Sequence, residues 1–198
     1  MLQPDFKHFK NEFESGKNQL IFKRLPADLD TAVSLMIKLT KDKKNSFLLE
    51  SVTGGEIKGR YSVIGMDPDL IWECYGQSSR IKVKINEKFS AFTKCQEAPL
   101  LALRKILKET KIDMPKSIPQ MAAGLFGFLG YDMIRLVENL PNVNPDVLKL
   151  PDAVMIRPQV TIIIDGVKGE IIIVSPVWVN KFNNAELAYQ SAVKKVMK

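Results

Sequence analysis

Two apolar runs joined by a short turn decide the fold: AVMIRPQVTIII at Ala153–Ile164, DGVKG at 165–169 and EIIIVSPV at Glu170–Val177. Isoleucine and valine dominate both runs, and these β-branched residues favour extended strands. A connection this short and glycine-rich joins antiparallel strands, because parallel strands need a crossover of a dozen or more residues. The sequence therefore predicts a long β-hairpin.

Ahead of this hairpin, the chain carries several shorter β-rich runs separated by turn residues. We expect strands at 47–52, 60–66, 70–75 and 80–85, with turns at Gly54-Gly55, Asp67-Pro68-Asp69 and 76–79. A further glycine-punctuated apolar strand is expected at 121–130. Short strands with turns between them are typical of an antiparallel meander.

Helices are expected between these strands, wherever apolar residues recur at helical spacing. The first carries Phe6, Phe9 and Phe13; the second begins after a cap at Asp28 or Asp30, with its apolar face within 32–39; others lie at 100–108, 131–140 and after a cap at Asn184. Because strands and helices do not alternate strictly, the sequence predicts an α+β fold with a largely antiparallel sheet and packed helices.

The amino-acid composition argues against several classes of function. The 198 residues are 45% hydrophobic, which is enough for a core, and the formal net charge is +7. Most basic residues are lysines spread along the chain, whereas sequence-specific nucleic-acid contacts favour arginine, so we expect no nucleic-acid partner. Cys74 and Cys95 have no metal-ligand spacing, and no apolar run has membrane-spanning length. We expect a cytoplasmic protein that neither binds nor spans a membrane.

Residue types that support catalysis are scarce. His8 is the only histidine, and no acidic or cysteine partner stands in register with it. The carboxylate pairs Asp28/Asp30 and Asp67/Asp69 flank a helix start and a proline, so capping and turn formation explain them. We therefore assign no catalytic residue and no metal ligand.

Gly124, Gly127 and Gly130 do not form a phosphate-binding loop, because no Gly-Lys-Ser/Thr follows them and their spacing is not that of a dinucleotide fingerprint. We expect a buried strand whose glycines admit a neighbouring backbone or helix. Asp132 and Arg135 are three residues apart and are expected to form a local ion pair.

The run FLLESVTGGEIKGRYSVIG at 47–65 contains residues that could bind a small molecule. Glu50 and Ser51 stand side by side at a strand end, and Arg60 follows a Gly-Gly loop. A carboxylate and a hydroxyl can hold the ammonium group of a zwitterion. A plain strand end, with Glu50 in solvent and Ser51 starting a turn, is the alternative. Adjacent strand residues point to opposite faces, so both contact one ligand only where the strand ends or bulges.

Together with MAAGLFGFLGYD (121–132), LPDAV (150–154) and IRP (156–158), this run resembles the amino-terminal region of anthranilate synthase component I. The resemblance spans nearly the whole chain. It implies the first step of tryptophan biosynthesis, in which the full-length lyase converts chorismate and ammonia to anthranilate and pyruvate with Mg²⁺. A glutamine amidotransferase subunit, component II, supplies the ammonia.

In that family the Leu-Leu-Glu-Ser motif forms part of the feedback site for L-tryptophan. The resemblance implies that Glu50 and Ser51 hold the amino group of tryptophan, with Leu49 or Leu48 against its apolar part and Arg60 nearby. The family's chorismate pocket, magnesium carboxylates and acid/base groups belong to a carboxyl-terminal domain that lies beyond these 198 residues.

We therefore expect residues 1–198 to be a regulatory and scaffold domain that is inactive without its catalytic domain and needs no cofactor of its own. Two alternatives remain open. One is the corresponding part of aminodeoxychorismate synthase component I, although the fuller Leu-Leu-Glu-Ser and Gly-Arg-Tyr-Ser blocks favour the anthranilate branch. The other is a stand-alone module that binds an amino acid or a partner.

Overall fold

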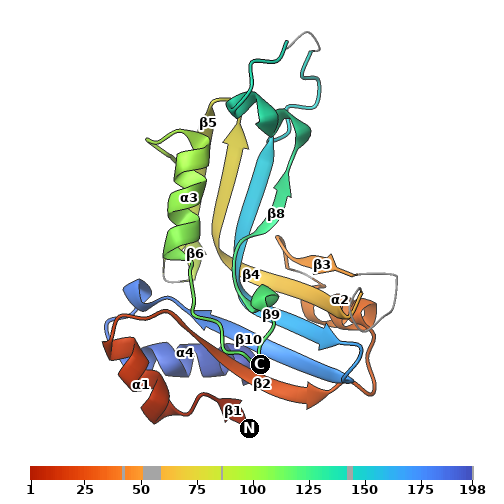
Figure 1. The fold of residues 1–198 in the computed structure, drawn as a ribbon, viewed down its shortest axis with the longest axis vertical. Helices are drawn as coiled ribbons and strands as arrows, with labels where there is room; N and C mark the ends of the chain where they lie inside the picture. Colours follow the sequence, from red (N-terminus) through yellow and green to blue (C-terminus); the bar gives the residue numbers. More distant parts are fainter. Residues whose placement is uncertain (42, 51–58, 86, 142–144, 198) are drawn as a thin grey trace. The chain divides into compact units, whose positions relative to one another are not determined.

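A computed structural model describes residues 1–41, 43–50, 59–85, 87–141 and 145–197. The chain forms two compact units. Unit 1 comprises residues 1–68, 111–124 and 158–198, and unit 2 comprises residues 69–110 and 125–157. Strands β4 (Tyr61–Tyr75) and β9 (Ala153–Asp165) contribute residues to both units (Figure 1). The mixture of helices with an antiparallel sheet confirms the predicted α+β class.

The sheet of unit 1 is built around the predicted hairpin. β10 (Glu170–Val177) pairs antiparallel with β9, from Glu170 opposite Asp165 to Val174 opposite Thr161, which confirms the hairpin. The other edge of β10 pairs along its whole length with β2 (Gln19–Pro26), and β2 pairs with the short β1 (Leu2–Gln3). Strand order in this part is β1-β2-β10-β9-β4.

Helices α1 (Phe6–Glu14) and α4 (Ala185–Met197) cover one face of this sheet. Phe9 and Phe13 of α1 pack with Ile21, Val177 and the alanines of α4. The cap predicted at Asn184 is confirmed, because its Oδ1 accepts from the backbone N–H of Leu187 at 2.9 Å. On the other face of the sheet, segment 111–124 packs Ile118 and Ala122 over the opposite side chains of β2, β9 and β10.

The second helix, α2 (Ala32–Thr40), begins differently from the prediction. Its cap is Thr31, which forms a capping box with Ser34, and not Asp28 or Asp30. Asp30 instead accepts a hydrogen bond from Ser34 Oγ at 2.8 Å and binds the ammonium of Lys38. The Thr31 hydroxyl, one residue nearer the helix, makes the capping bond to Ser34 N–H, and the Asp30 carboxylate binds the Ser34 hydroxyl.

Unit 2 contains further strands of the same sheet and has a core of its own. The second half of β4 pairs with β5 (Ser78–Ile85), which also pairs with β6 (Lys88–Phe89) and β7 (Thr93–Lys94), while β8 (Phe126–Leu129) pairs with β9. Helix α3 (Pro99–Glu109) packs Leu103 and Ile106 against Leu70, Trp72 and Cys74. The segment Tyr131–Leu136 is a 3₁₀ helix, shorter than predicted, and it contains the expected Asp132–Arg135 ion pair.

Strand β4 corrects one prediction of the sequence. The turn expected at Asp67-Pro68-Asp69 is absorbed into one continuous strand, with Asp67 at a positive φ of 53°. Asp69 is fully buried, and its carboxylate accepts from Arg157 Nε at 2.7 Å and Nη2 at 3.1 Å. An ion partner 88 residues away therefore gives Asp69 a structural role that its local sequence does not indicate.

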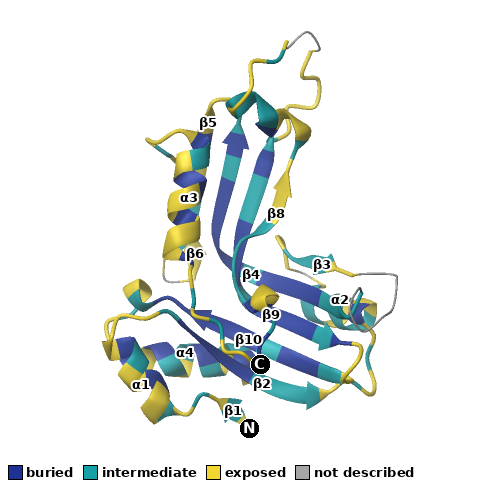
Figure 2. Cartoon of the chain, viewed as in Figure 1, coloured by how far each residue is buried: buried dark blue, intermediate teal, exposed yellow. Residues whose placement is uncertain are grey.

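Strand β8 confirms one expectation and corrects another. A β-carbon at Gly127 would lie 1.9 Å from the carbonyl oxygen of Val154, so glycine is required for the predicted close backbone approach. The predicted burial is wrong, because Phe128 and Leu129 are half exposed (Figure 2). The strand is also shorter than residues 121–130, since a 3₁₀ helix occupies Gln120–Ala122.

Candidate functional site

The candidate site predicted from the sequence begins on strand β3 (Phe47–Leu49). β3 pairs antiparallel with β4, with Phe47 opposite Gly65, Leu48 opposite Ile64 and Leu49 opposite Val63. The ring of Phe47 fills the space that a side chain at position 65 would occupy, because a β-carbon on Gly65 would lie 2.2 Å from it. Gly65 therefore fixes how closely β3 lies on β4.

The two leucines of this motif have different environments. Leu48 packs against a core cluster that includes Ile64 and Met66, whereas the Leu49 side chain is 55% exposed. Glu50 directly follows the strand and is exposed. The structure therefore brings Leu49 and Glu50 together at the solvent-facing end of β3. Ser51 and the Gly54-Gly55 loop lie outside the described residues.

Arg60, the residue directly before β4, is bound to the end of β9. Its Nε and Nη2 donate to the two carboxylate oxygens of Asp165 at 2.9 and 2.7 Å. Asp165 Oδ1 also accepts from the backbone N–H groups of Val167 and Lys168, and the N–H of Gly166 donates to the carbonyl of Arg60 at 2.9 Å. Arg60 thereby joins the start of β4 to the turn of the β9–β10 hairpin.

These contacts alter the acidity of Asp165. The side-chain hydrogen bond from Arg60 is the main reason that the pKa of this carboxyl is below its ordinary value; burial opposes this effect, while the two backbone N–H groups add to it. Sequence reasoning missed Asp165 because it opens an Asp-Gly turn, where a carboxylate is ordinary. The ion pair joins residues 105 positions apart, so no local pattern indicates it.

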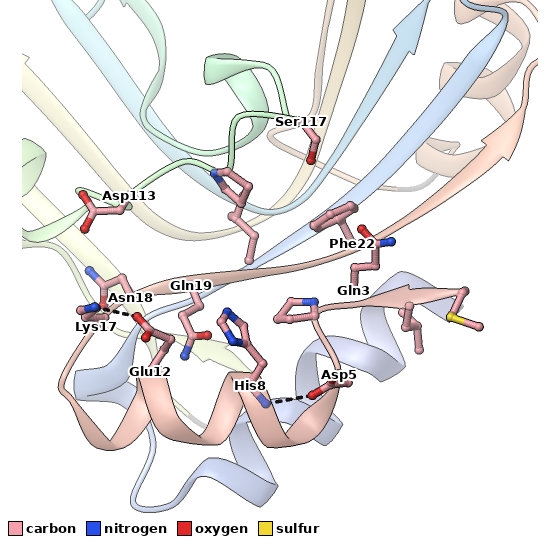
Figure 3. Close-up of a pocket in the computed structure, with 15 residues that line it drawn as sticks. Gln3, Asp5, His8, Glu12, Lys17, Asn18, Gln19, Phe22, Asp113 and Ser117 are labelled. Carbon is pink, nitrogen blue, oxygen red and sulfur yellow. Dashed lines mark hydrogen bonds and ion pairs between the residues drawn. The ribbon is translucent and has the colours of Figure 1, made fainter.

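Three pockets among the described residues are lined by residues other than Leu49, Glu50 and Arg60. One of about 540 Å³ lies within unit 1, among α1, β1, β2 and residues 113–117 (Figure 3). His8, for which the sequence indicates no partner, contributes to its wall.

Other chemistry is limited in the part of the chain that the structure describes. No group of three or more His, Cys, Asp or Glu side chains there is arranged to hold a metal ion. Burial raises the pKa of the Cys74 thiol to about 11, with the Asp152 charge as a smaller cause. No helix among the described residues is long and apolar enough to cross a membrane.

The fold as a whole matches a solved structure. The crystal structure of anthranilate synthase component I from Streptococcus pneumoniae TIGR4 superposes with a TM-score of 0.52 over 87% of this chain and 35% of that one, at 18% identity. That likeness defines the class of fold: the α+β arrangement found in that component I. No family model matches the sequence.

Sequence similarity identifies the family more specifically than the fold does. The chain is 54% identical over 192 residues to anthranilate synthase component 1 of Cereibacter sphaeroides, covering 97% of this chain and 38% of the relative. The protein of that name from Acetivibrio thermocellus is 35% identical over 86% of this chain, and the one from Synechocystis is 32% identical over 100%. The chain is therefore a homologue of the amino-terminal region of anthranilate synthase component 1. It spans less than two-fifths of the length of these three relatives.

Proposed function

We propose that this chain is the regulatory and scaffold part of an anthranilate synthase component I, the lyase that forms anthranilate and pyruvate from chorismate and ammonia. The observation that carries the proposal is the 54% identity to a component 1 protein over 97% of the chain. Component II, a glutamine amidotransferase, would supply the ammonia, and a domain matching the rest of the relatives would hold chorismate and Mg²⁺.

Within this proposal, the end of β3 is a feedback site for L-tryptophan. The carboxylate of Glu50 and the hydroxyl of Ser51 would receive the ammonium group, and the exposed side chain of Leu49 would lie against the indole. Arg60 would contribute through its position beside the site, because its bond to Asp165 fixes the start of β4. Burial of an indole face on Leu49 and charge-assisted bonds to Glu50 are complementary sources of affinity.

Regulation follows from thermodynamic linkage. If tryptophan at this site lowers the affinity of the assembled enzyme for chorismate, chorismate lowers the affinity for tryptophan by the same factor. The chain alone should form no anthranilate and should bind tryptophan weakly, since the groups from the rest of the enzyme would be missing from the site.

The decisive experiment places this chain in front of the remaining residues of the Cereibacter sphaeroides relative, replacing the homologous region. Anthranilate fluorescence then measures turnover and its inhibition by tryptophan. Ser51→Phe fills the proposed site, so half-inhibition should require at least about tenfold more tryptophan, equal to ~1.4 kcal/mol of binding, with turnover retained. Glu50→Gln should act in the same direction.

Matched controls are Ser78→Phe and Glu138→Gln, which alter exposed residues outside the proposed site. Both should keep the inhibition profile of the unmodified chimera. Wild-type tryptophan sensitivity in the Ser51→Phe chimera would show that the site assignment is wrong. Anthranilate formation by the purified 198-residue chain would contradict its assignment as a non-catalytic part.

A further inference from the structure

Strand β5, in unit 2, carries a row of cations on one face. Ile81 and Val83 pack against the core of this unit, so the alternate residues Arg80, Lys82 and Lys84 lie on the opposite face of the strand. Successive members of the row are about 7 Å apart along the strand, the rise of two extended residues. The row therefore presents positive charge at a regular spacing.

The neighbouring strand β7 adds a fourth cation. Lys94 is exposed and stands directly opposite Arg80 in the register of the two strands, and it completes what we call the cationic face: Arg80, Lys82, Lys84 and Lys94. Like charges directly opposite each other destabilise a sheet. The Glu73 carboxylate offsets the charge of Arg80, whose Nε donates to it at 2.7 Å. Among the described residues, Lys82 and Lys94 have no carboxylate within ion-pair distance.

Two phenylalanine rings order the middle of the cationic face. Lys82 Nζ lies 5.0 Å from the centre of the Phe89 ring and 4.5 Å from that of the Phe92 ring. The Arg80 guanidinium carbon is 4.3 Å from the centre of the Phe92 ring, and Lys84 Nζ is 5.6 Å from that of Phe89. Cation–π attraction holds these long side chains in place, so an anion that binds them removes less conformational entropy.

The spacing and the ordered ammonium groups match a row of carboxylates. A carboxylate accepts charge-assisted hydrogen bonds from an ammonium, and it would relieve the repulsion within the cationic face. The side chains on one face of an extended polypeptide also repeat at about 7 Å. We propose that the cationic face docks an extended, acidic segment of a partner polypeptide.

Nucleic acid is the other polyanion that such a face might attract. Proteins that bind single strands stack the bases on aromatic side chains. Here cations lie over the Phe89 and Phe92 rings, and Arg80, the one arginine of the cationic face, is bound to Glu73. The acidic polypeptide is therefore the better match.

The test measures binding of short fluorescent peptides to the full 198-residue chain by fluorescence polarisation at low salt. One probe alternates glutamate with serine, and two matched probes carry glutamine or lysine in place of glutamate. The glutamate probe should bind with a dissociation constant below about 1 mM. The glutamine and lysine probes should show no saturable binding.

Charge variants locate the binding surface. Lys82→Gln and Lys94→Gln should each weaken binding of the glutamate probe about fivefold, the effect of one unit charge near contact distance in water. The double variant should weaken it about 25-fold if the two effects add. Lys7→Gln/Lys116→Gln is the matched control, because it removes the same charge from exposed positions of unit 1 and should change the affinity less than about twofold.

Three results would overturn the proposal. The first is no saturable binding of the glutamate probe below about 1 mM, and the second is equal weakening by the unit 1 control. The third is tighter binding of an oligothymidylate of the same length, which would assign the cationic face to nucleic acid. Circular dichroism shows whether each variant folds, and Lys94→Gln, at an exposed position, tests the proposal even if Lys82→Gln disturbs the fold. The outcome is independent of the tryptophan proposal, because β3 plays no part in it.

Discussion

Two arginine–aspartate pairs, Arg60–Asp165 and Asp69–Arg157, join the β4 and β9 segments by the same bidentate chemistry in very different surroundings. In unit 2 the side chains of Arg157 and Asp69 are 7% and 1% exposed, whereas in unit 1 those of Arg60 and Asp165 are 25% and 4% exposed. The buried pair acts only within the core. The partly exposed pair holds the residue that precedes β4, the strand with which β3 pairs, and solvent reaches it. The two pairs have the same bidentate geometry and differ mainly in burial. We therefore assign Asp69–Arg157 a structural role and treat Arg60–Asp165 as the pair that a ligand could influence.

The largest expected effect comes from breaking the buried pair. Asp69→Ala removes the carboxylate that binds the buried Arg157 guanidinium in unit 2, so the free energy of unfolding should fall by about 3–5 kcal/mol. Urea denaturation followed by circular dichroism measures this loss. The double variant Asp69→Leu/Arg157→Met should recover most of it, because no charge then remains buried. A single-variant loss under about 1 kcal/mol would contradict this account.

Breaking the partly exposed pair should cost less. Arg60→Met keeps the aliphatic stem but removes the charge-assisted bonds to Asp165, and we expect a loss of about 1.5–3 kcal/mol in the same measurement. Arg104→Met, at an exposed position on α3, is the matched control and should lie within about 0.5 kcal/mol of wild type. A larger loss for Arg60→Met than for Asp69→Ala would reverse the comparison.

Lowering the pH should gradually remove the contribution of Asp165 to the free energy of unfolding. Its pKa is lower in the folded state than the ordinary value of about 3.9, so the folded state holds the proton less tightly than the unfolded state. The stabilisation is therefore complete above that ordinary value and is lost as the pH falls through the folded pKa. The difference in unfolding free energy between wild type and Arg60→Met should be constant near neutral pH and shrink in strong acid. A difference that instead grows in acid would contradict the assignment.

Local patterns in the sequence were sufficient to predict much of the fold. The β9–β10 hairpin, helices α1 and α3, and the Asn184 cap rest on periodicity and short-range chemistry, which act over a few residues. The turn predicted at Asp67-Pro68-Asp69 failed because a distant arginine gives Asp69 a buried partner. Thr31 was overlooked as a cap because two aspartates nearby carry the same signal.

In the candidate site, too, features set by neighbouring residues could be predicted, whereas contacts between distant residues could not. Leu49 and Glu50 lie together at the end of β3 as the motif indicates, because they are neighbours in the chain. The Arg60–Asp165 bond could not be predicted, since its two residues meet only after β4 and β9 have formed. The pocket beside His8 was also missed, because α1, β2 and residues 113–117 line it together. Ser51 of the motif lies outside the described residues, so its place in the site remains a prediction.

The glycine at position 127 has a consequence for handling the protein. By allowing β8 to lie close against β9, Gly127 places the half-exposed Phe128 and Leu129 on a strand that pairs, among the described strands, with β9 alone. Apolar side chains on a strand at the edge of a sheet favour pairing with another extended chain. The chain produced by itself should therefore associate increasingly at high concentration, and purification should be planned around dilute, short storage.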